Sequence, residues 1–336
     1  MFVRKVYFIL DITKNKVFML NLKNKYLVRE IFSRNVTRVN YAKSATFKAK
    51  LEIDMANYGE NEAQGKFWND APGQSWVKHD AVMNLRLGNI SDILFNRLGD
   101  VVVANVLDIG CGTGSTSIRL AETLAQEATV TGIDISEPML GKAREKSANL
   151  PSVSFVAADA QAFAFETGKF DAAISRFGVM FFEDPPKAFS NIRSAMKPGS
   201  QLTFVCWAPL EENEFFSLPL QTVLDFVPSE YEFVANAPGP LAFSNKEYLM
   251  GILQSSGFSN CDIEVVKTTV DTTDTPEEDA AVLMQIGFGA RAVREAELDQ
   301  KRMDDLYQLF LETSRSRQSD GVIKYGATIY VVTANA

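Results

Sequence analysis

The chain has 336 residues, of which 46% are hydrophobic and 23% charged, a composition typical of a folded protein rather than a disordered one. This length predicts two domains, or one large α/β domain with insertions. Every apolar run is much shorter than the roughly 18 residues of a membrane helix, which argues against a membrane span. Three widely spaced cysteines indicate neither a disulfide framework nor a zinc cluster. We therefore expect a cytoplasmic protein without a metal site.

Charge is distributed unevenly along the chain. Residues 1–54 contain twelve Lys or Arg and four Asp or Glu, a net charge of +8 that leaves −16 on residues 55–336. An acidic body repels nucleic acid and anionic membranes, so we expect neither as a partner. The basic segment is interpreted as an organelle-targeting segment, a nucleic-acid arm, or an extension outside the catalytic domain. We favour the extension, with a second possible start at Met55.

From about residue 57, short apolar runs alternate with segments of helical period. The runs predict strands at 101–107, 129–133, 153–157, 170–175 and 201–207. Helices are expected at 117–125, after Ser136 as N-cap, and at 184–196. Strands and helices that alternate at this spacing indicate βαβ units and a mainly parallel sheet.

The pattern is less regular after residue 207. It predicts a loop-and-helix insertion at 209–240, a helix at 245–256, a strand at 261–269, helices across 276–317 and a last strand at 327–333. We therefore expect one domain, 55–336, with insertions at about 209–256 and 276–317 that cap the substrate end of the sheet.

A strand that runs into a glycine-rich turn is the main chemical signal. The turn reads Asp108-Ile-Gly110-Cys111-Gly112-Thr113-Gly114. Glycines here let a ligand approach bare backbone, and the helix that follows offers unpaired N–H groups. The glycines fall at every second residue, unlike the G-x-G-x-x-G of dinucleotide-binding turns, and no Gly-Lys-Ser/Thr of a phosphate loop follows. Asp108 suits a cationic ligand better than a pyrophosphate.

Acidic residues also follow the next two predicted strands. Asp134 is placed to accept both hydroxyls of a ribose. Asp159 is placed to accept from an adenine amino group, with the Ala160 backbone beside a ring nitrogen. After the fourth strand, Ser175 and Arg176 open into the same crevice, because ligands in such sheets bind beyond the carboxyl ends of the strands. His79, the single histidine, is a weaker candidate for a general base.

These segments resemble the class I S-adenosylmethionine-dependent methyltransferases, and most closely the ubiquinone/menaquinone-biosynthesis type. The matching segments are VLDIGCGTGSTSIRLA, VTGIDISEPMLGKAR, VSFVAADAQAFAF, FDAAISRFGVMFFEDPPKAFSNIRSAMKPG and QLTFVCW. The resemblance implies a Rossmann-like α/β fold: a seven-stranded, mostly parallel sheet with an antiparallel last strand and helices on both faces.

The resemblance also implies roles for single residues. Asp108, Gly110 and Thr113 would hold the methionine end of the cofactor, and Ser175 would line the methyl-transfer side. Ile135 and Met139 would pack on the adenine. The expected cofactor-binding set is Asp108, Gly110, Cys111, Gly112, Thr113, Gly114, Asp134, Ile135, Met139, Asp159, Ala160, Ser175 and Arg176. The candidates for a lid or substrate wall are Trp68, Trp76, Phe177, Met180 and Trp207.

The expected function is methyl transfer from S-adenosylmethionine to a small, apolar or aromatic molecule. The sequence identifies no catalytic residue, and a sulfonium leaving group makes a strong general base unnecessary for many acceptors. Two alternatives stay open: a non-catalytic protein that binds S-adenosylmethionine, and a nicotinamide-dependent oxidoreductase on a similar fold. The acceptor atom and the oligomeric state are not predicted.

Overall fold

The computed structural model describes residues 7–11, 16–20, 61–99, 105–123, 128–227 and 234–336. The chain divides into two units, Met1–Ile53 and Asp54–Ala336. In the first unit, β1 (Tyr7–Asp11) and β2 (Lys16–Leu20) pair as an antiparallel hairpin. Most of the basic segment 1–54 lies outside the described residues, so its separation from the catalytic domain stays a prediction.

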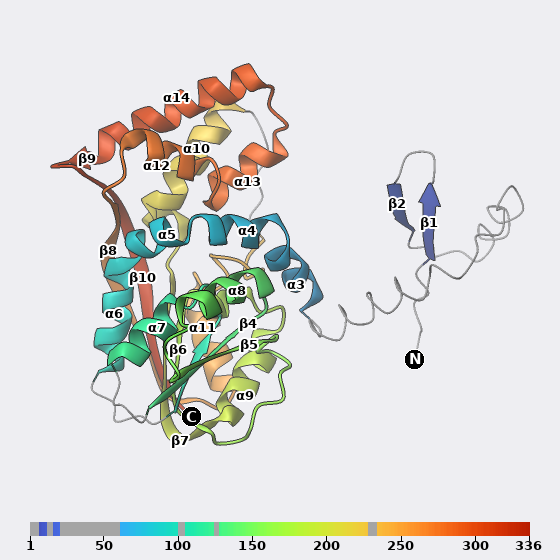
Figure 1. Cartoon of the computed structure of the whole chain (residues 1–336), viewed down its shortest axis with the longest axis vertical. Coiled ribbons are helices and arrows are strands. Elements are labelled where there is room, and N and C mark those ends of the chain that lie inside the picture. Colours follow the sequence, from blue (N-terminus) through green and yellow to red (C-terminus); the bar gives the residue numbers. More distant parts are fainter. Residues whose placement is uncertain (1–6, 12–15, 21–60, 100–104, 124–127, 228–233) are drawn as a thin grey trace, which may run out of the picture. The chain divides into compact units, whose positions relative to one another are not determined.

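The second unit is built on a mixed sheet (Figure 1). Its strands have the order β5-β4-β3-β6-β7-β10-β8. Five of them pair in parallel: β3 (Asn105–Ile109), β4 (Thr129–Asp134), β5 (Val153–Ala157), β6 (Phe170–Arg176) and β7 (Met196–Trp207). The last long strand, β10 (Val322–Asn335), lies antiparallel between β7 and β8 (Ser259–Thr272). The predicted α/β fold with an antiparallel last strand is confirmed.

One short strand was not predicted. β9 (Gln318–Ser319) pairs only with β10, which gives the sheet eight strands instead of seven. It forms because Asp320 and Gly321 adopt positive φ, 52° and 78°, and turn the chain tightly between β9 and β10.

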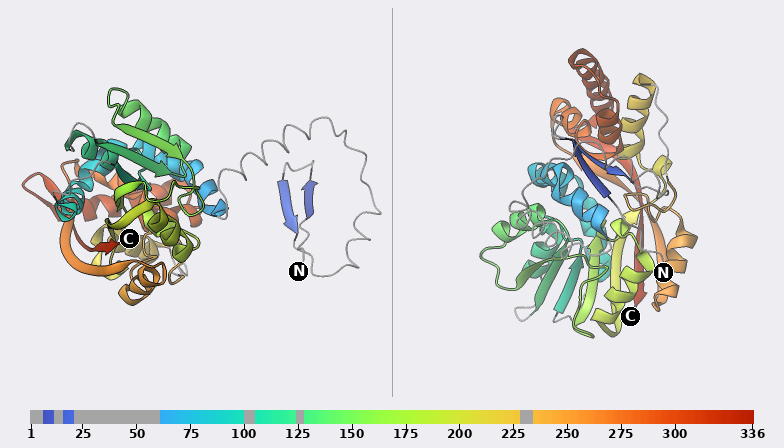
Figure 2. Two further views of the ribbon diagram at one scale, coloured as in Figure 1. Left: turned by 90° about the horizontal axis from the view of Figure 1, so that it is seen from below. Right: turned by 90° about the vertical axis from the view of Figure 1, so that its right-hand side faces the viewer.

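Helices cover both faces of the sheet (Figure 2). Alternate residues of a strand point to opposite faces, and β3 shows this division. Val106 packs with Leu98 and Leu120 in one buried cluster, and Leu107 packs with Phe189 and Leu249 in another. The first face carries α6 (Gly88–Leu98) and α7 (Ser115–Thr123), and the second carries α9 (Pro185–Ala195) and α11 (Lys246–Ser255). Near-continuous apolar strands therefore follow from burial on both sides.

The predicted N-cap at Ser136 is confirmed. Ser136 accepts a hydrogen bond from the backbone N–H of Met139 and begins α8 (Glu137–Lys146). Its hydroxyl also donates to the carbonyl of Trp68 at 2.7 Å, which ties α8 to the segment before the sheet.

The segment before the sheet forms four short helices: α3 (Glu62–Asn69), α4 (Ala71–Lys78), α5 (Asp80–Arg86) and α6. The lid candidates Trp68 and Trp76 thus lie on two separate helices, α3 and α4. Asp70 is extended between them, and Pro72 occupies the first turn of α4, a position that suits proline because no N–H is needed there.

The two predicted insertions contain helices beyond the carboxyl ends of the strands (Figure 1). The first holds the 3₁₀ turn η3 (Leu210–Glu212) and α10 (Glu214–Phe226). The second holds α12 (Pro276–Leu283), α13 (Gly287–Glu295) and α14 (Gln300–Arg317). Within the described part of the chain, no helix is both long and apolar enough to cross a membrane.

Candidate active site

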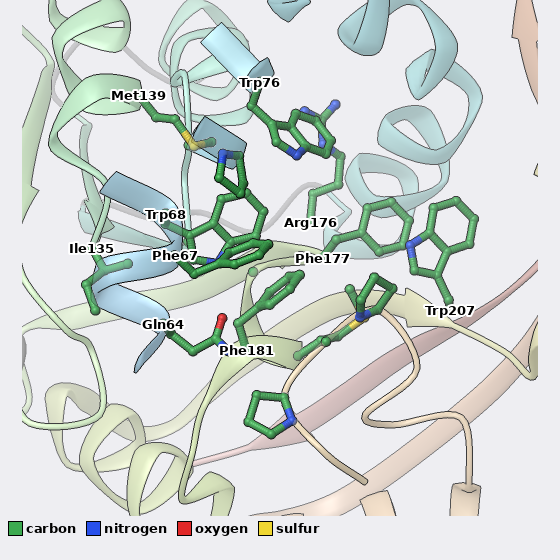
Figure 3. Close-up of a pocket in the computed structure, with 18 of the residues that line it drawn as sticks. Gln64, Phe67, Trp68, Trp76, Ile135, Met139, Arg176, Phe177, Phe181 and Trp207 are labelled. Carbon is green, nitrogen blue, oxygen red and sulfur yellow. The ribbon is translucent and has the colours of Figure 1, made fainter. Parts of the chain in front are cut away.

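A cavity of about 1190 Å³ lies at the carboxyl ends of the parallel strands. Its wall is formed by the ends of β3 to β7, by α3 to α5, and by residues of both insertions. Figure 3 shows Arg176, Phe177 and Trp207 on one side and the side chains of Gln64, Trp68 and Phe181 on another. The strand ends thus meet the insertions around one cavity, as expected for this topology.

The glycine turn after β3 forms the floor of the cavity. Gly110 and Gly112 have φ of 64° and 56°, values that glycine adopts without strain. A Cβ on Gly110 would lie 2.5 Å from the Cα of Gly178, so the two backbones touch. Gly114 is not part of the cavity wall: a Cβ there would meet Phe155 and Ala143 at 2.8 and 2.9 Å. Gly114 therefore allows α7 to pack closely on its neighbours.

Asp108, expected at the methionine end of the cofactor, does not line the cavity. Its carboxylate is fully buried away from the cavity and accepts hydrogen bonds from Thr116 and Ser117, both at 2.6 Å. The reason is strand alternation, which points Asp108 to the same face as Val106, toward α7. Burial raises the pKa of Asp108 from 3.8 to about 6. Asp108 thus holds the start of α7 in place behind the glycine turn.

Asp134, at the end of β4, lines the cavity as expected. One carboxylate oxygen accepts from the backbone N–H of Gly112 at 2.8 Å, and the other accepts from the N–H of Ser136 at 2.8 Å. Burial raises the pKa of Asp134, and these backbone bonds oppose that effect. The carboxylate therefore fixes the glycine turn and the start of α8 relative to each other.

Asp159 lines the same end of the cavity and is 5% exposed. Its Oδ1 accepts from the backbone N–H of Gln161 at 3.0 Å, whereas its Oδ2 has no hydrogen-bond partner among the described residues. Burial raises the pKa of this carboxyl group, too. A buried acceptor without a partner is costly, so the oxygen is available to a donor on a ligand.

Arg176 lines the cavity at the end of β6, but Ser175 does not. The guanidinium of Arg176 donates to Ser91 at 2.7 Å and to Asn84 at 2.8 Å, and burial lowers its pKa to about 10. The hydroxyl of Ser175 donates to the carbonyl of Ile109 at 2.7 Å and accepts from the N–H of Gly178. Ser175 therefore positions backbone and does not line the cavity.

Aromatic rings form the opposite end of the cavity. Phe177 has φ of 68°, a left-handed conformation that is strained for a bulky residue. This conformation stacks its ring on Trp207, with centroids 4.2 Å apart and planes 6° from parallel. Phe216 meets Trp207 edge-on at 4.9 Å, and Phe288 meets Phe216 at 5.3 Å.

Most of the predicted site residues do line this cavity. They are Gly110, Cys111, Gly112, Thr113, Asp134, Ile135, Met139, Asp159, Ala160 and Arg176, together with Trp68, Trp76, Phe177, Met180 and Trp207. The predicted residues that do not line it are Asp108, Gly114 and Ser175.

Sequence reasoning missed Asp80, which lines the cavity beside the glycine turn. It accepts from the hydroxyl of Thr113 and forms an ion pair with Lys146 at 2.9 Å. His79 precedes it but does not line the cavity; its ring nitrogen lies 3.2 Å from the side-chain oxygen of Gln285. In the segment WVKHD, the histidine is the residue that indicates a general base. Nothing in the pattern of this segment indicates that Asp80 lies in a site.

Comparison with known proteins assigns this site to a class. Residues 106–199 match a family described as a methyltransferase domain. The demethylmenaquinone methyltransferase of Staphylococcus aureus is 32% identical over 163 residues, which cover 46% of this chain and 67% of the relative. The chain belongs to the class I S-adenosylmethionine-dependent methyltransferases.

Two solved structures are similar to this chain at low sequence identity. Phosphoethanolamine N-methyltransferase 2 of Haemonchus contortus is 21% identical, with a TM-score of 0.45 over 74% of this chain. That match spans about half of the relative, 52% of its length. A methyltransferase from Aquifex aeolicus is 20% identical, with a TM-score of 0.42 over 58% of this chain and 91% of its own.

Proposed function

We propose that this methyltransferase binds S-adenosylmethionine across the ends of β3 to β6 and methylates a small apolar or aromatic molecule. The observation that carries the proposal is the division of one cavity into two ends. Its polar end holds Asp134 and Asp159, and its other end is lined by the rings of Phe177, Trp207 and Phe216.

The polar end fits the parts of this cofactor. Asp134 would accept from the ribose hydroxyls, and the unpartnered oxygen of Asp159 would accept from the adenine amine. The bare backbone of Gly110 and Gly112 would lie under the methionine half. Because Asp108 points away from the cavity, we propose Asp80 as the carboxylate nearest the ammonium group.

Bound S-adenosylmethionine supplies a methyl group on a sulfonium sulfur, which leaves as a neutral thioether when the acceptor attacks the methyl carbon. The residues of the chain chiefly position the acceptor and exclude water from the site. The stacked rings of Phe177 and Trp207 would hold a flat acceptor against the junction of the two ends. Fixed orientation of this kind is worth up to about 7–11 kcal/mol in effective concentration.

An apolar acceptor is supported by the residues at the ring-lined end. Met180, Phe215, Met284 and Ile286 also line the cavity, and its polar lining residues include Arg291 and Arg294 of α13. A largely apolar pocket with a few polar groups is typical of small-molecule sites. The name of the Staphylococcus aureus relative also specifies a small molecule, demethylmenaquinone. The net charge of −16 on residues 55–336 opposes binding of a polynucleotide.

A binding measurement and a transfer measurement test the proposal together. We expect S-adenosylhomocysteine, but not NADH, to bind in isothermal titration calorimetry. Protein incubated with methyl-labelled cofactor and a cell extract should label small organic molecules and leave added tRNA and DNA unlabelled. Label in the polynucleotides, or tight binding of the cofactor with no labelled product from any extract, would contradict the proposal.

A further inference from the structure

A row of four aromatic rings leads along the cavity from the end of β6 to α13. Phe177 stacks on Trp207, and Figure 3 shows these two rings side by side. Phe216 meets Trp207 edge-on. Phe288 of α13 then meets Phe216, with ring centroids 5.3 Å apart. All four residues line the cavity, so an apolar acceptor bound along them reaches α13 with its far end.

One face of α13 continues the cavity wall beyond the rings. Gly287, Arg291 and Arg294 line the cavity, and their spacing of i, i+4 and i+7 places them on one side of a helix. Gly289 lies on the opposite side, where a Cβ would be 2.8 Å from Pro219 of α10. Both arginines are exposed. α13 is thus held against α10 by its back, and its two guanidinium groups lie where the cavity opens to solvent.

Charge divides the wall of the cavity as polarity does. Among the described residues, the charged members of the wall are Asp80, Asp134, Asp159, Arg176, Arg291 and Arg294. Asp134 and Asp159 lie at the polar end, and Asp80 lies beside the glycine turn through its bond with Thr113. In the part of the wall that the structure describes, the ring-lined end therefore meets solvent through arginines and through no carboxylate.

A third cation lies close to the start of α13. Nζ of Lys78, the last residue of α4, donates to the side-chain oxygen of Gln285 at 3.1 Å. Gln285 lines the cavity and precedes α13 by two residues. Residues 55–336 carry a net charge of −16, so the positive charge here is opposite to that of the rest of the unit. A cleft lined by one sign of charge attracts ligands of the other sign, which indicates an anionic group on the ligand.

We propose that the acceptor is an organic acid, with an apolar or aromatic body along the rings and a carboxylate or phosphate group bound by Arg291 and Arg294. The inference rests on the proposed function and narrows its substrate class. A guanidinium donates two parallel hydrogen bonds to an oxyanion of this kind. Because both arginines lie on the solvent side, the acid keeps part of its hydration while the body is buried. The bound acid would orient the acceptor, with the opposite end of its body toward the methyl group.

Two fluorescent probes that differ by one anionic group test the arginines directly. Anilinonaphthalene sulfonate has the rings of the neutral compound phenylnaphthylamine and carries a sulfonate in addition. Both probes are titrated into the full chain in the presence of saturating S-adenosylhomocysteine, and the wild type should bind the sulfonate more tightly. Arg291→Met and Arg294→Met should each weaken binding of the sulfonate about 3- to 5-fold, as for a favourable ion pair open to solvent. Binding of the neutral probe should change less than about 2-fold, because it has no group for a guanidinium to bind.

Two further variants make the result specific. Arg294→Lys keeps the charge and should retain most of the preference for the sulfonate. Arg315→Met removes an exposed arginine of α14 outside the cavity wall and should change neither affinity, which controls for the net charge of the protein. Equal affinity of the wild type for the two probes, or equal effects of the Met variants at 291 and 294 on both, would overturn the inference while the methyltransferase assignment stands.

The natural acceptor provides a second test. Since the arginines hold the acid away from the methyl group, the acid stays in the product. Small molecules that the wild type labels in a cell extract should therefore be retained by an anion-exchange column. Treatment with a phosphatase should abolish retention of a phosphate monoester and leave that of a carboxylate unchanged. Labelled products that pass the column unretained would overturn the inference alone, whereas a wild type that neither binds S-adenosylhomocysteine nor labels any product would contradict the proposed function itself.

Discussion

Arg86 and Asp279, 193 residues apart in the chain, form a fully buried ion pair with 2.5 Å between nitrogen and oxygen. Arg86 ends α5, the helix that carries Asp80 at the cavity, and Asp279 lies in α12 of the second insertion. The other oxygen of Asp279 accepts from the hydroxyls of Ser314 and Tyr325, at 2.6 and 2.5 Å. One carboxylate thus joins α5, α12, α14 and β10.

Removal of Arg86 should destabilise the protein strongly. Arg86→Met leaves a buried carboxylate without its cation, and we expect a loss of about 3–5 kcal/mol in the free energy of unfolding. The matched control is Arg97→Met, since Arg97 pairs with Asp262 and Glu264 on the surface and its loss should cost less than about 1 kcal/mol. Urea denaturation of both variants measures the difference, and similar losses would contradict a special role for the buried pair.

Asp108 should make stability depend on pH. Its carboxyl pKa is about 6 in the folded protein and 3.8 in an unperturbed group, so between these values the folded state holds a proton that the unfolded chain has released. The free energy of unfolding therefore falls as pH rises from about 4 to about 6, by about 3 kcal/mol from this residue. Asp108→Asn should remove that fall.

The comparison is made by urea denaturation of wild type and Asp108→Asn at several pH values. The free energy of unfolding of the variant, relative to that of the wild type, should rise steadily from pH 4 to pH 6.5. Above pH 6.5 the difference should stay constant. Asp305→Asn, a change at an exposed position of α14, serves as control. If the free energy of unfolding changes with pH in the same way for Asp108→Asn and wild type, burial of this carboxylate does not cause the pH dependence.

Asp134→Ala should weaken binding of S-adenosylhomocysteine by about 1.5–3 kcal/mol, the range for hydrogen bonds to a charged group. The carboxylate would lose the ribose hydroxyls, and the glycine turn would lose the bond from Gly112 that now holds it. Calorimetry on the variant, with Asp305→Ala alongside, measures the change. An unchanged dissociation constant would refute the ribose assignment.

Removal of residues 1–54 should leave cofactor affinity and thermal stability nearly unchanged. The division of the chain after Ile53 and the charge of opposite sign on the two parts both support this outcome. Calorimetry with S-adenosylhomocysteine and a thermal melt on the shortened chain provide the measurement. Aggregation, or a melting temperature lower by many degrees, would assign a structural role to the segment.

The sequence was sufficient to predict the central strands because β3 and β6 are largely buried on both faces, and the flanking strands keep enough apolar residues to be recognised. Apolar runs such as 129–133 and 153–157 correspond closely to β4 and β5. Residues 101–104 of the first predicted strand lie outside the described residues, and β3 begins at Asn105. Helices α5 and α6 were not predicted, since α5 has only seven residues and no hydrogen-bonded side-chain cap at its start.

The site was harder to predict than the sheet. A spacing shows that an acid follows a strand, but it does not show to which face the side chain turns. Asp134 and Asp159 turn into the cavity, whereas Asp108, one residue before the end of β3, turns to α7. Three further residues of the cavity wall are Asn61, Gln64 and Asp80. Short helices that come well before the glycine turn in the sequence pack against the sheet and bring these residues to the cavity. Local sequence patterns do not encode such long-range contacts.

The position of β10 has a consequence for how the chain is assembled during synthesis. The strands that surround the cofactor end, β3 to β6, are complete by residue 176, and they pair with one another. β7 and β8 do not pair with each other; each pairs with β10, which starts only at Val322. A nascent chain therefore carries two open strand edges, a hazard for aggregation, until the ribosome has made β10. The cofactor half is in a position to fold on the ribosome, and the acceptor half closes only after it.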